Sequence, residues 1–322
     1  PLVSPGFAGL VAVPLAPHTL HSRAIVTASN DVVEMDLSHN ADTREATLFV
    51  DGELLEFGPT SVYRFGDLDV LDSAWECELV NGRVSGARRA PTTSALTVYV
   101  DAPTEAAGVE ARNRLEDVLD AGAAEGRLGR LRAGEWYTRC LCTAQGKDAW
   151  WFDGRYFEAR LQLLRPDPVW TREQAQDFAI DRSGQAPALG KDYPCDYPYD
   201  YTARRTVKGY VLDARSPAAC RITVYGPAKS PYVWIGANRY GVDADVPAGG
   251  LLVVDGREKS VVLYDIDGNA TDAYALRQRG ARGSGSYVFE RVAPGYNAVA
   301  WDNSFGFEVR AYVERSAPKW TI

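Results

Sequence analysis

The chain has 322 residues, of which 46% are hydrophobic and 24% are charged, so it is long enough for two ordinary domains and has the composition of a globular protein. No apolar run approaches the roughly 18 residues needed to cross a bilayer, so we expect neither a transmembrane span nor a membrane partner. The net charge of −8 argues against a protein that binds nucleic acid by neutralising phosphates. The first residues contain several prolines and no basic segment, so we expect no signal peptide.

The first hundred residues predict short strands separated by turns. Residues 1–40 show little periodicity, and we expect an extended arm there with one strand near 23–28. Asp51-Gly52 and Asn81-Gly82 are strong hairpin signals, because these residues tolerate positive φ. The segments ATLFV before Asp51 and ELLEF after Gly52 are the paired strands of the first hairpin. Leu96–Val100 is rich in β-branched and aromatic residues and predicts a buried strand.

One amphipathic helix is predicted near residues 105–121. Thr104 is a suitable N-cap, and Glu105 places a negative charge at the positive end of the helix dipole. An apolar stripe at helical spacing follows. It consists of Ala111, Leu115, Val118, Leu119 and Gly122. We expect this helix to lie across strands, with a partner-binding helix as the alternative. Arg127, Arg130 and Arg132, which follow the helix, are predicted to lie in a solvated turn.

Residues 136–170 predict a long β-hairpin that closes a domain. Phe157, Ala159, Leu161 and Leu163 fall on one face of a strand with period two. Residues 145–148 and 153–155 have turn chemistry. Pro166 and Pro168 each lack the N–H that a ladder bond needs, so we place the end of an N-terminal α+β domain at residue 170.

The remaining chain predicts a linker and an all-β domain. Residues 171–205 have no sustained period and repeat Asp-Tyr-Pro, which favours extended or turn structure, although their tyrosines can also pack on a domain or a neighbouring chain. From residue 206 to 322, short β-rich runs alternate with glycine turns at the spacing of a β-sandwich. These runs are 220–225, 232–235, 251–255, 260–264, 287–290, 298–301 and 307–313.

The sequence offers no recognisable catalytic, metal or cofactor motif. Five cysteines form an odd count without framework spacing, and the three histidines lie far from the Cys140–Cys142 pair, so we expect free thiols and no metal site. No nucleophile elbow or phosphate loop occurs in a strand–turn–helix setting. Asp265-Ile-Asp267-Gly-Asn269 partly matches a calcium loop, but its glycine comes too early and Leu276 stands where a glutamate is required. A hairpin turn is the favoured interpretation there.

The order of these elements resembles the distal tail proteins (Dit) of long-tailed bacteriophages. The resemblance covers roughly residues 96–320. It is carried by the strand–helix element LTVYVDAPTEAAGVEARNRLEDVLD, the strand GEWYTRCLC, the ending DPVW, and the C-terminal segments LLVVDGREKSVVLYD, FERVAPGYNAVAW and FEVRAYVERSAPKW. The family carries a galectin-like β-sandwich in its C-terminal half. The implied fold is therefore mainly β: a ring-forming N-terminal domain over 1–170 and a galectin-like sandwich over 206–322.

The resemblance implies a structural virion protein without enzyme activity or cofactor. Such proteins form a homo-hexameric ring at the tail tip, assembled in the host cytoplasm, which joins the tail tube protein to the hub, spike or lysin protein and often carries receptor-binding proteins. DNA passes through the ring without sequence-specific contact, and we expect an acidic lumen from the net charge. Trp150, Trp151 and Phe152, at the predicted hairpin tip, are then candidate contacts between subunits or with the tube.

Two other functions remain open. One is a carbohydrate-binding module that contacts the host surface, for which Tyr232, Trp234, Tyr240 and Trp301 are the candidate sugar or partner contacts. Aromatic rings on strands more often belong to cores and interfaces, so the structural role is preferred. The other is a wall-degrading hydrolase, which predicts peptidoglycan release and for which no residue constellation is found.

Overall fold

A computed structural model describes residues 33–180 and 206–319, apart from residues 37, 38, 41, 42, 45, 51, 52, 58–60, 127 and 151–153. All of these residues belong to one compact unit, Asp31–Ile322. The predicted strand near 23–28 and most of the predicted linker lie outside the described residues. No helix in the described part is long and apolar enough to cross a membrane.

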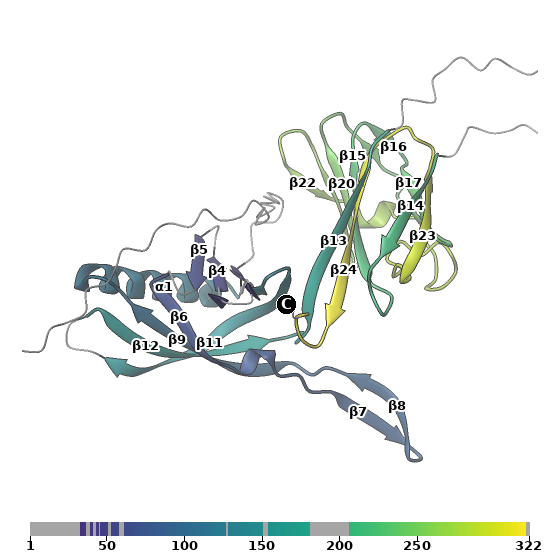
Figure 1. Ribbon diagram of the computed structural model, residues 1–322. Coiled ribbons are helices and arrows are strands. Elements are labelled where there is room, and N and C mark those ends of the chain that lie inside the picture. The colour runs from purple at the N-terminus through teal and green to yellow at the C-terminus, as the bar shows by residue number, and fades with distance from the viewer. Residues whose placement is uncertain are drawn as a thin grey trace, which may run out of the picture. The chain divides into compact units, whose positions relative to one another are not determined.

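Most strands join one large sheet whose order does not follow the sequence (Figure 1). The order is β22-β21-β20-β15-β24-β13-β11-β12-β9-β6-β5-β4, and β10 pairs with β11 and, in parallel, with β1. The predicted class, mainly β with one helix, is confirmed. The strands before α1 are β1 (Val33–Asp36), β2 (His39–Asn40), β3 (Thr43–Arg44), β4 (Ala46–Val50), β5 (Glu53–Phe57), β6 (Tyr63–Leu68), β7 (Glu76–Val80), β8 (Arg83–Arg88) and β9 (Thr92–Asp101).

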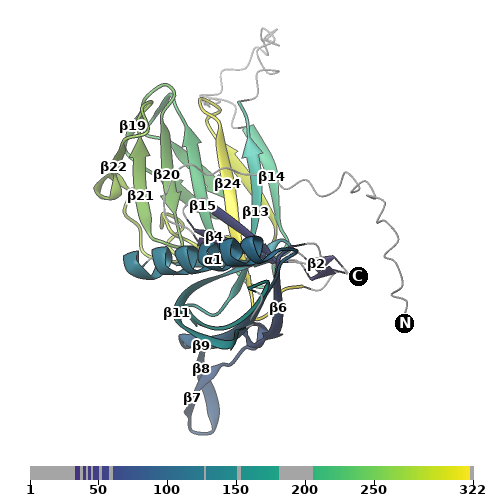
Figure 2. The ribbon, with the colours of Figure 1, turned by 90° about the vertical axis from the view of Figure 1, so that its left-hand side faces the viewer.

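The helix α1 (Glu105–Glu125) forms as predicted and extends one turn further. Thr104 caps it by accepting a hydrogen bond from the backbone N–H of Ala107, and Gly126 ends it with a φ of 65°. Ala111, Leu115, Val118 and Leu119 are buried. Figure 2 shows α1 lying across the sheet, where it contacts β4, β9, β11 and β12. The predicted apolar stripe therefore faces the strands.

The predicted long hairpin is formed by β11 (Trp136–Trp150) and β12 (Tyr156–Arg165), while β10 (Gly129–Ala133) precedes it. The prediction of a turn at 145–148 is wrong, because Gln145, Gly146 and Lys147 pair with β12. The pairing register shifts between Cys142 and Ala144 and again between Lys147 and Ala149, so β11 continues through the segment that was predicted to turn. Arg130 and Arg132 also lie in a strand rather than in a solvated turn.

Two sheets enclose an aromatic core in the C-terminal part of the chain. One is formed by β13 and the strands from β24 to β22, and the other has the order β14-β23-β17-β18. Phe178 of β13 stacks on Phe307 of β24 with ring centroids 4.8 Å apart, and Trp301 of β23 meets Phe307 edge-on at 5.1 Å. Because these rings come from both sheets, they close the space between the two layers.

The strands of this part are short and mostly antiparallel. They are β13 (Trp170–Phe178), β14 (Thr206–Leu212), β15 (Ala219–Tyr225), β16 (Ala228–Lys229), β17 (Tyr232–Ile235), β18 (Asn238–Gly241), β19 (Asp245–Val246), β20 (Leu251–Asp255), β21 (Ser260–Tyr264), β22 (Ala270–Asp272), β23 (Gly295–Trp301) and β24 (Phe307–Arg315). Two single turns of 3₁₀ helix are η1 (Asp69–Leu71) and η2 (Tyr274–Leu276).

Two further predictions are wrong. Residues 287–290 form no strand, because the carbonyl oxygens of Tyr287 and Glu290 accept hydrogen bonds from the side chains of Asn238 and Tyr240 instead of a ladder. Residues 171–178, assigned to the linker, form most of β13. The division into the two predicted domains itself stays a prediction.

We expect Gly108→Ala to displace the start of α1. A Cβ atom on Gly108 would lie 2.3 Å from the carbonyl oxygen of Gly154 in the β11–β12 connection, and backbone cannot yield as a flexible side chain can. Although alanine favours helix by up to ~1 kcal/mol, overpacking should give a net loss of about 1–2 kcal/mol in the free energy of unfolding. Urea unfolding measures it. Gly86→Ala, whose Cβ would meet Glu78 at an ordinary 3.6 Å, is the control; equal stability in both variants would contradict the packing described.

Candidate functional site

Strand β13 is shared between two groups of strands. Along its whole length, from Trp170 to Phe178, it pairs with β24. At its start, Thr171 and Arg172 also pair with Tyr137 and Trp136 of β11. The N-terminal and C-terminal strands therefore meet on the backbone of a single strand.

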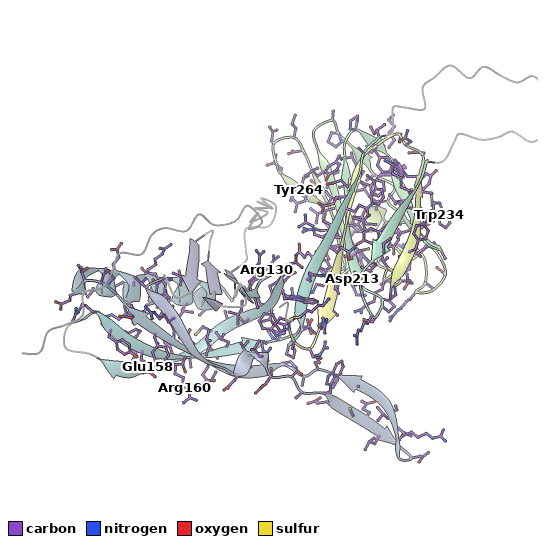
Figure 3. All side chains as sticks on the ribbon, in the orientation of Figure 1. Arg130, Glu158, Arg160, Asp213, Trp234 and Tyr264 are labelled. Atoms are coloured by element: carbon purple, nitrogen blue, oxygen red, sulfur yellow. The ribbon has the colours of Figure 1, made fainter. Side chains whose placement is uncertain are left out.

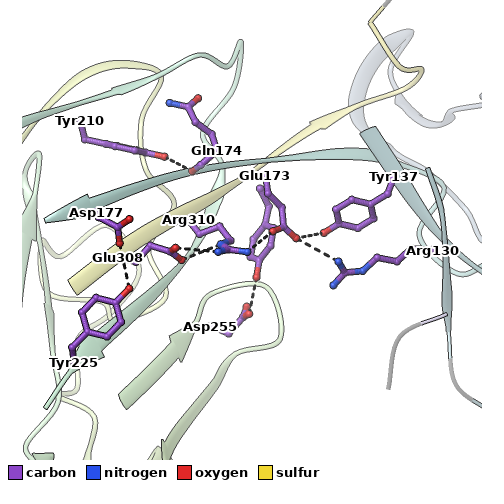
Figure 4. A network of polar contacts seen from close by, with 11 residues as sticks. Arg130, Tyr137, Glu173, Gln174, Asp177, Tyr210, Tyr225, Asp255, Glu308 and Arg310 are labelled. Atoms are coloured by element: carbon purple, nitrogen blue, oxygen red, sulfur yellow. Dashed lines mark hydrogen bonds and ion pairs between the residues drawn. The ribbon is translucent and has the colours of Figure 1, made fainter. Parts of the chain in front are cut away.

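A largely buried carboxylate on this strand, that of Glu173 with 21% of its side chain exposed, contacts side chains from three other strands (Figure 4). Glu173 accepts hydrogen bonds from the Tyr137 hydroxyl at 2.9 Å and from Nη1 of Arg310 at 2.9 Å, and Nη1 of Arg130 lies 3.8 Å away. Arg310 also binds both carboxylate oxygens of Glu308 at 3.0 Å. Each charge in the network thus has an opposite charge or a donor beside it.

The titration of these groups follows from their surroundings. Burial alone would raise the pKa of Glu173, but Arg130, Arg310 and the hydrogen bonds outweigh it and hold the pKa below its usual value. Burial and the nearby Glu173 raise the pKa of Tyr137 to about 12. Burial would lower the pKa of Arg310, yet its bonds to Glu308 and Glu173 raise it. At neutral pH Glu173 and Arg310 are therefore charged, and the Tyr137 hydroxyl keeps the proton that it donates to Glu173. The network thus joins three strands to β13.

Similar tyrosine–aspartate contacts extend the network on the face of the sheet that carries Glu173 and Arg310. The Tyr312 hydroxyl donates to Oδ2 of Asp255 at 2.9 Å, and the Tyr225 hydroxyl donates to Oδ1 of Asp177 at 3.2 Å. Burial is the main cause that raises the pKa of both phenols, and the negative charge of the neighbouring aspartate raises it further. Within the described ranges, no three His, Cys, Asp or Glu side chains are placed to bind a metal ion.

A second feature is the hairpin β7–β8, which we call the arm and define as residues 76–88. Its strands pair only with each other, and Figure 1 shows them extending away from the neighbouring strands. Asn81 and Gly82 make the predicted turn with φ values of 52° and 75°. The arm nevertheless carries exposed apolar side chains, with Leu79 69% and Val84 63% exposed. Among the described residues no third strand covers the arm. A two-stranded hairpin without a covered face is marginally stable in water, so the arm is expected to need a covering surface.

The base of the arm is held by two arginines. Arg165 is buried and donates to the carbonyl oxygens of Val70 at 2.7 Å and Asp72 at 3.0 Å, and to Oγ of Ser94 at 3.1 Å. Arg89 lies over the ring of Trp75 at 4.1 Å. Arg89 also donates to Ser316 at 3.0 Å, near the end of the chain. The arm therefore projects from a fixed base.

The sequence-predicted interface aromatics are only partly placed. Trp150 is the last residue of β11, but its side chain is outside the described part, as are Trp151 and Phe152 altogether. Their role in contacts between subunits stays a prediction. The Asp265 segment forms the turn between β21 and β22, as favoured: Asp265 accepts hydrogen bonds from the backbone of Asp267 and Asn269, each at 2.9 Å.

The four predicted sugar contacts fall into two pairs. Trp301 is 0% exposed and its indole N–H donates to the carbonyl oxygen of Phe305, while Tyr240 is buried too. Neither ring offers a face to a ligand in this structure, so both are corrected to core residues. Tyr232 and Trp234 are half-buried and lie on the outer face of β17, opposite to the buried Val233 and Ile235.

Sequence reasoning missed two exposed sets of residues. The apolar residues of the arm were included only in a predicted hairpin, because local sequence does not tell whether a third strand will cover it. Tyr296, which is 70% exposed on β23, was also missed. Its position five residues before the buried Trp301 places it on the opposite face of the strand, and this parity is the signal that could have identified it.

The comparisons with known proteins concern the fold. No protein-family model and no curated protein matches the sequence. Two solved structures of the phage P2 baseplate in its activated conformation, one with Ca and one with Sr, each contain a chain with a TM-score of 0.52 and 9% identity, covering 84% of this chain and 96% of that chain. The chain thus has a fold found in a phage baseplate.

A third solved structure carries the name that the sequence resemblance suggested. It is described as the SPP1 Dit (gp 19.1) protein, "a paradigm of hub adsorption apparatus in Gram-positive infecting phages", and it matches with a TM-score of 0.45 and 10% identity over 78% of this chain and 92% of that chain. The two baseplate structures, with TM-scores of 0.52, confirm the predicted resemblance to phage tail proteins at the level of the fold.

We expect Glu173→Gln to destabilise the protein in a pH-dependent way. Removing the charge leaves Arg130 and Arg310 partly buried without their shared carboxylate, which should cost about 2–4 kcal/mol at pH 7. Because the folded-state pKa of Glu173 is lowered, its contribution is fully present above the unfolded value of about 4.3 and is lost as the pH falls through the folded value. The difference between wild type and variant should therefore begin to shrink as the pH falls below about 4.3, and it should close only below the folded-state pKa of Glu173.

Urea unfolding at several pH values measures this difference. Glu258→Gln is the control, since Glu258 forms a more exposed ion pair with Arg139 at 2.7 Å that should contribute less than about 1 kcal/mol. If Glu173→Gln costs no more than the control, or costs the same at pH 3 as at pH 7, the proposed role of the network is wrong.

Proposed function

We propose that the chain is a structural subunit of a bacteriophage tail tip. The fold shared with a baseplate chain supports this class of role. The observation that carries the proposal is the arm, whose exposed Leu79 and Val84 have no covering surface among the described residues of the chain. A subunit that is completed by its neighbours explains such a surface, whereas an independent enzyme or binding module does not need it.

We propose further that the copies form a closed ring of six. A ring needs heterologous contacts, in which one surface of a subunit meets a different surface of the next, and a projecting arm on a fixed base suits that geometry. Residues 1–170 are proposed to build the ring and residues 206–322 to lie outside it. The tail tube protein and a hub or spike protein are the proposed axial partners, and a receptor-binding protein is a possible peripheral one.

The proposed lumen surface is the face of the β6–β9–β12 sheet that α1 does not cover. Phe157, Ala159 and Leu161 are buried on the other face, so alternation places Glu158 and Arg160 here, as Figure 3 shows. Arg64 and Asp101 on neighbouring strands form an ion pair at 3.3 Å. Because both signs of charge alternate on this face, it should let DNA pass without holding it. In this proposal the lumen therefore carries both positive and negative side chains, instead of the acidic surface expected from the net charge alone.

The role needs no catalysis, and we propose none. Trp150, Trp151 and Phe152 remain proposed contacts between subunits or with the tube. In the sequence they precede Gly154, whose backbone packs against Gly108 near the start of α1.

The test is the mass of the purified full-length chain in solution by native mass spectrometry, together with an arm variant. We expect a hexamer, and we expect Leu79→Ser with Val84→Ser to shift it towards monomers by at least about tenfold in the assembly constant, since both side chains lose apolar burial. Thermal unfolding of the variant monomer should be little changed, because the two residues are exposed there.

Ile266→Ser, at an equally exposed apolar residue in the β21–β22 turn, is the matched control and should leave the hexamer intact. A wild-type chain that stays monomeric at all concentrations, or an arm variant that assembles like wild type, would refute the proposal that the arm joins the copies.

A further inference from the structure

The outer face of the β14-β23-β17-β18 sheet carries aromatic side chains separated by very small residues. Asn297, Val299 and Trp301 of β23 are buried, so Tyr296, Ala298 and Ala300 point outward. By the same alternation Tyr232 and Trp234 of β17 point outward, and Figure 3 shows where Trp234 lies. The register places Trp234 opposite Ala300 and Arg239. These residues share one surface of the sheet.

The floor of this surface is flat because of its glycines and alanines. A Cβ atom on Gly209 would approach the ring of Tyr296 to 2.7 Å, so the ring of Tyr296 lies directly over the backbone of β14. Ala298 lies between Tyr296 and Ala300, and Trp234 lies opposite Ala300, four residues or about 14 Å from Tyr296 along the strand at 3.4 Å per residue. Between the two rings, the outward residues Gly209, Ala298 and Ala300 of β14 and β23 are small.

A fixed polar cluster stands at the Tyr232 end of this floor. The guanidinium of Arg239 lies 4.5 Å from the Tyr232 ring centroid, and its Nη1 donates to Oε1 of Gln278. Nε2 of Gln278 in turn donates to Oδ1 of Asp243 at 2.8 Å. A Cβ atom on Gly241 would clash with Gln278, so the glycine is what lets this amide lie on the sheet.

The charges of the cluster favour an uncharged ligand. The charges of Arg239 and Asp243 cancel, and the neutral amide of Gln278 connects them, so this cluster itself has no net charge with which to attract a phosphate or a carboxylate. Planar amide and guanidinium groups instead present several donors and acceptors in fixed directions, which suits a ligand rich in hydroxyl groups. Aromatic rings beside them suit a ligand with an apolar face of C–H groups.

We propose that this face binds a neutral oligosaccharide. Sugar rings pack on Tyr296 and Trp234, and hydroxyl groups exchange hydrogen bonds with Gln278 and Arg239. This surface retains Tyr232 and Trp234 from the sequence-predicted contacts and replaces the buried pair by Tyr296, Arg239 and Gln278. It does not depend on the proposed ring, because all of its residues belong to one chain and none belongs to the arm.

The experiment is a titration of the full-length protein with maltotriose, cellotriose and chitotriose, followed by saturation-transfer NMR and tryptophan fluorescence. We expect at least one of them to bind in the micromolar to millimolar range. Tyr296→Ala and Gln278→Ala should each weaken that binding about five- to tenfold, because the first variant removes one ring contact and the second removes one hydrogen-bonding group. Ile266→Ala, at an exposed residue of the β21–β22 turn, should bind like wild type.

Thermal unfolding of each variant separates lost binding from lost folding, and Tyr296→Phe, which keeps the ring, should retain most of the affinity. No binding of any of the three oligosaccharides at millimolar concentration would overturn the proposal. Binding that survives in both Tyr296→Ala and Gln278→Ala would overturn it as well. So would a response only to polyglycerol phosphate that disappears with salt, or a change of oligomeric state in the Tyr296→Ala variant without sugar binding.

Discussion

The largely buried carboxylate of Glu173 on β13 is the constraint on which the described structure depends most. A charge taken out of water is tolerated only when opposite charges and donors surround it, and here Tyr137, Arg130 and Arg310 do so from β11, β10 and β24. The same strand supplies ladder bonds to β24 along its length and to β11 at its start. Pairing and charge compensation therefore specify the same arrangement of strands, and neither is satisfied without the other.

This junction is also where sequence reasoning failed. The hairpin turns at Asp51-Gly52 and Asn81-Gly82, the capped helix and the long β11–β12 hairpin were predictable, because each depends on residues close together in the chain. The segment TREQAQDF of β13 has polar residues on both faces, so no period-two pattern marks it as a strand. Its polar side chains are satisfied by Arg310, Val211 and Gly209, which are far away in sequence. Likewise, composition alone could not separate the buried Trp301 from the outward Trp234, since the face of each depends on strand register.

Two surfaces of the described chain remain incomplete in a single copy, and they differ in chemistry. The arm is apolar at Leu79, Val80 and Val84 and projects from a base fixed by Arg165 and Arg89, as expected of a contact with another protein. The outer face at Tyr296 and Trp234 is aromatic, shallow and bordered by a neutral polar cluster. A subunit that assembles through one surface and contacts a saccharide through the other would combine a structural role in a tail tip with adhesion to a cell surface. The fold shared with a baseplate chain is compatible with this combination.

The most direct test of this account is an electron-microscopy reconstruction of the assembled full-length protein at a resolution that traces strands. The account predicts a closed ring of six copies in which residues 76–88 of each copy pack against a neighbouring copy, with Leu79 and Val84 covered. A closed ring in which the arms remain in solvent, or an assembly held together only by other surfaces, would contradict it.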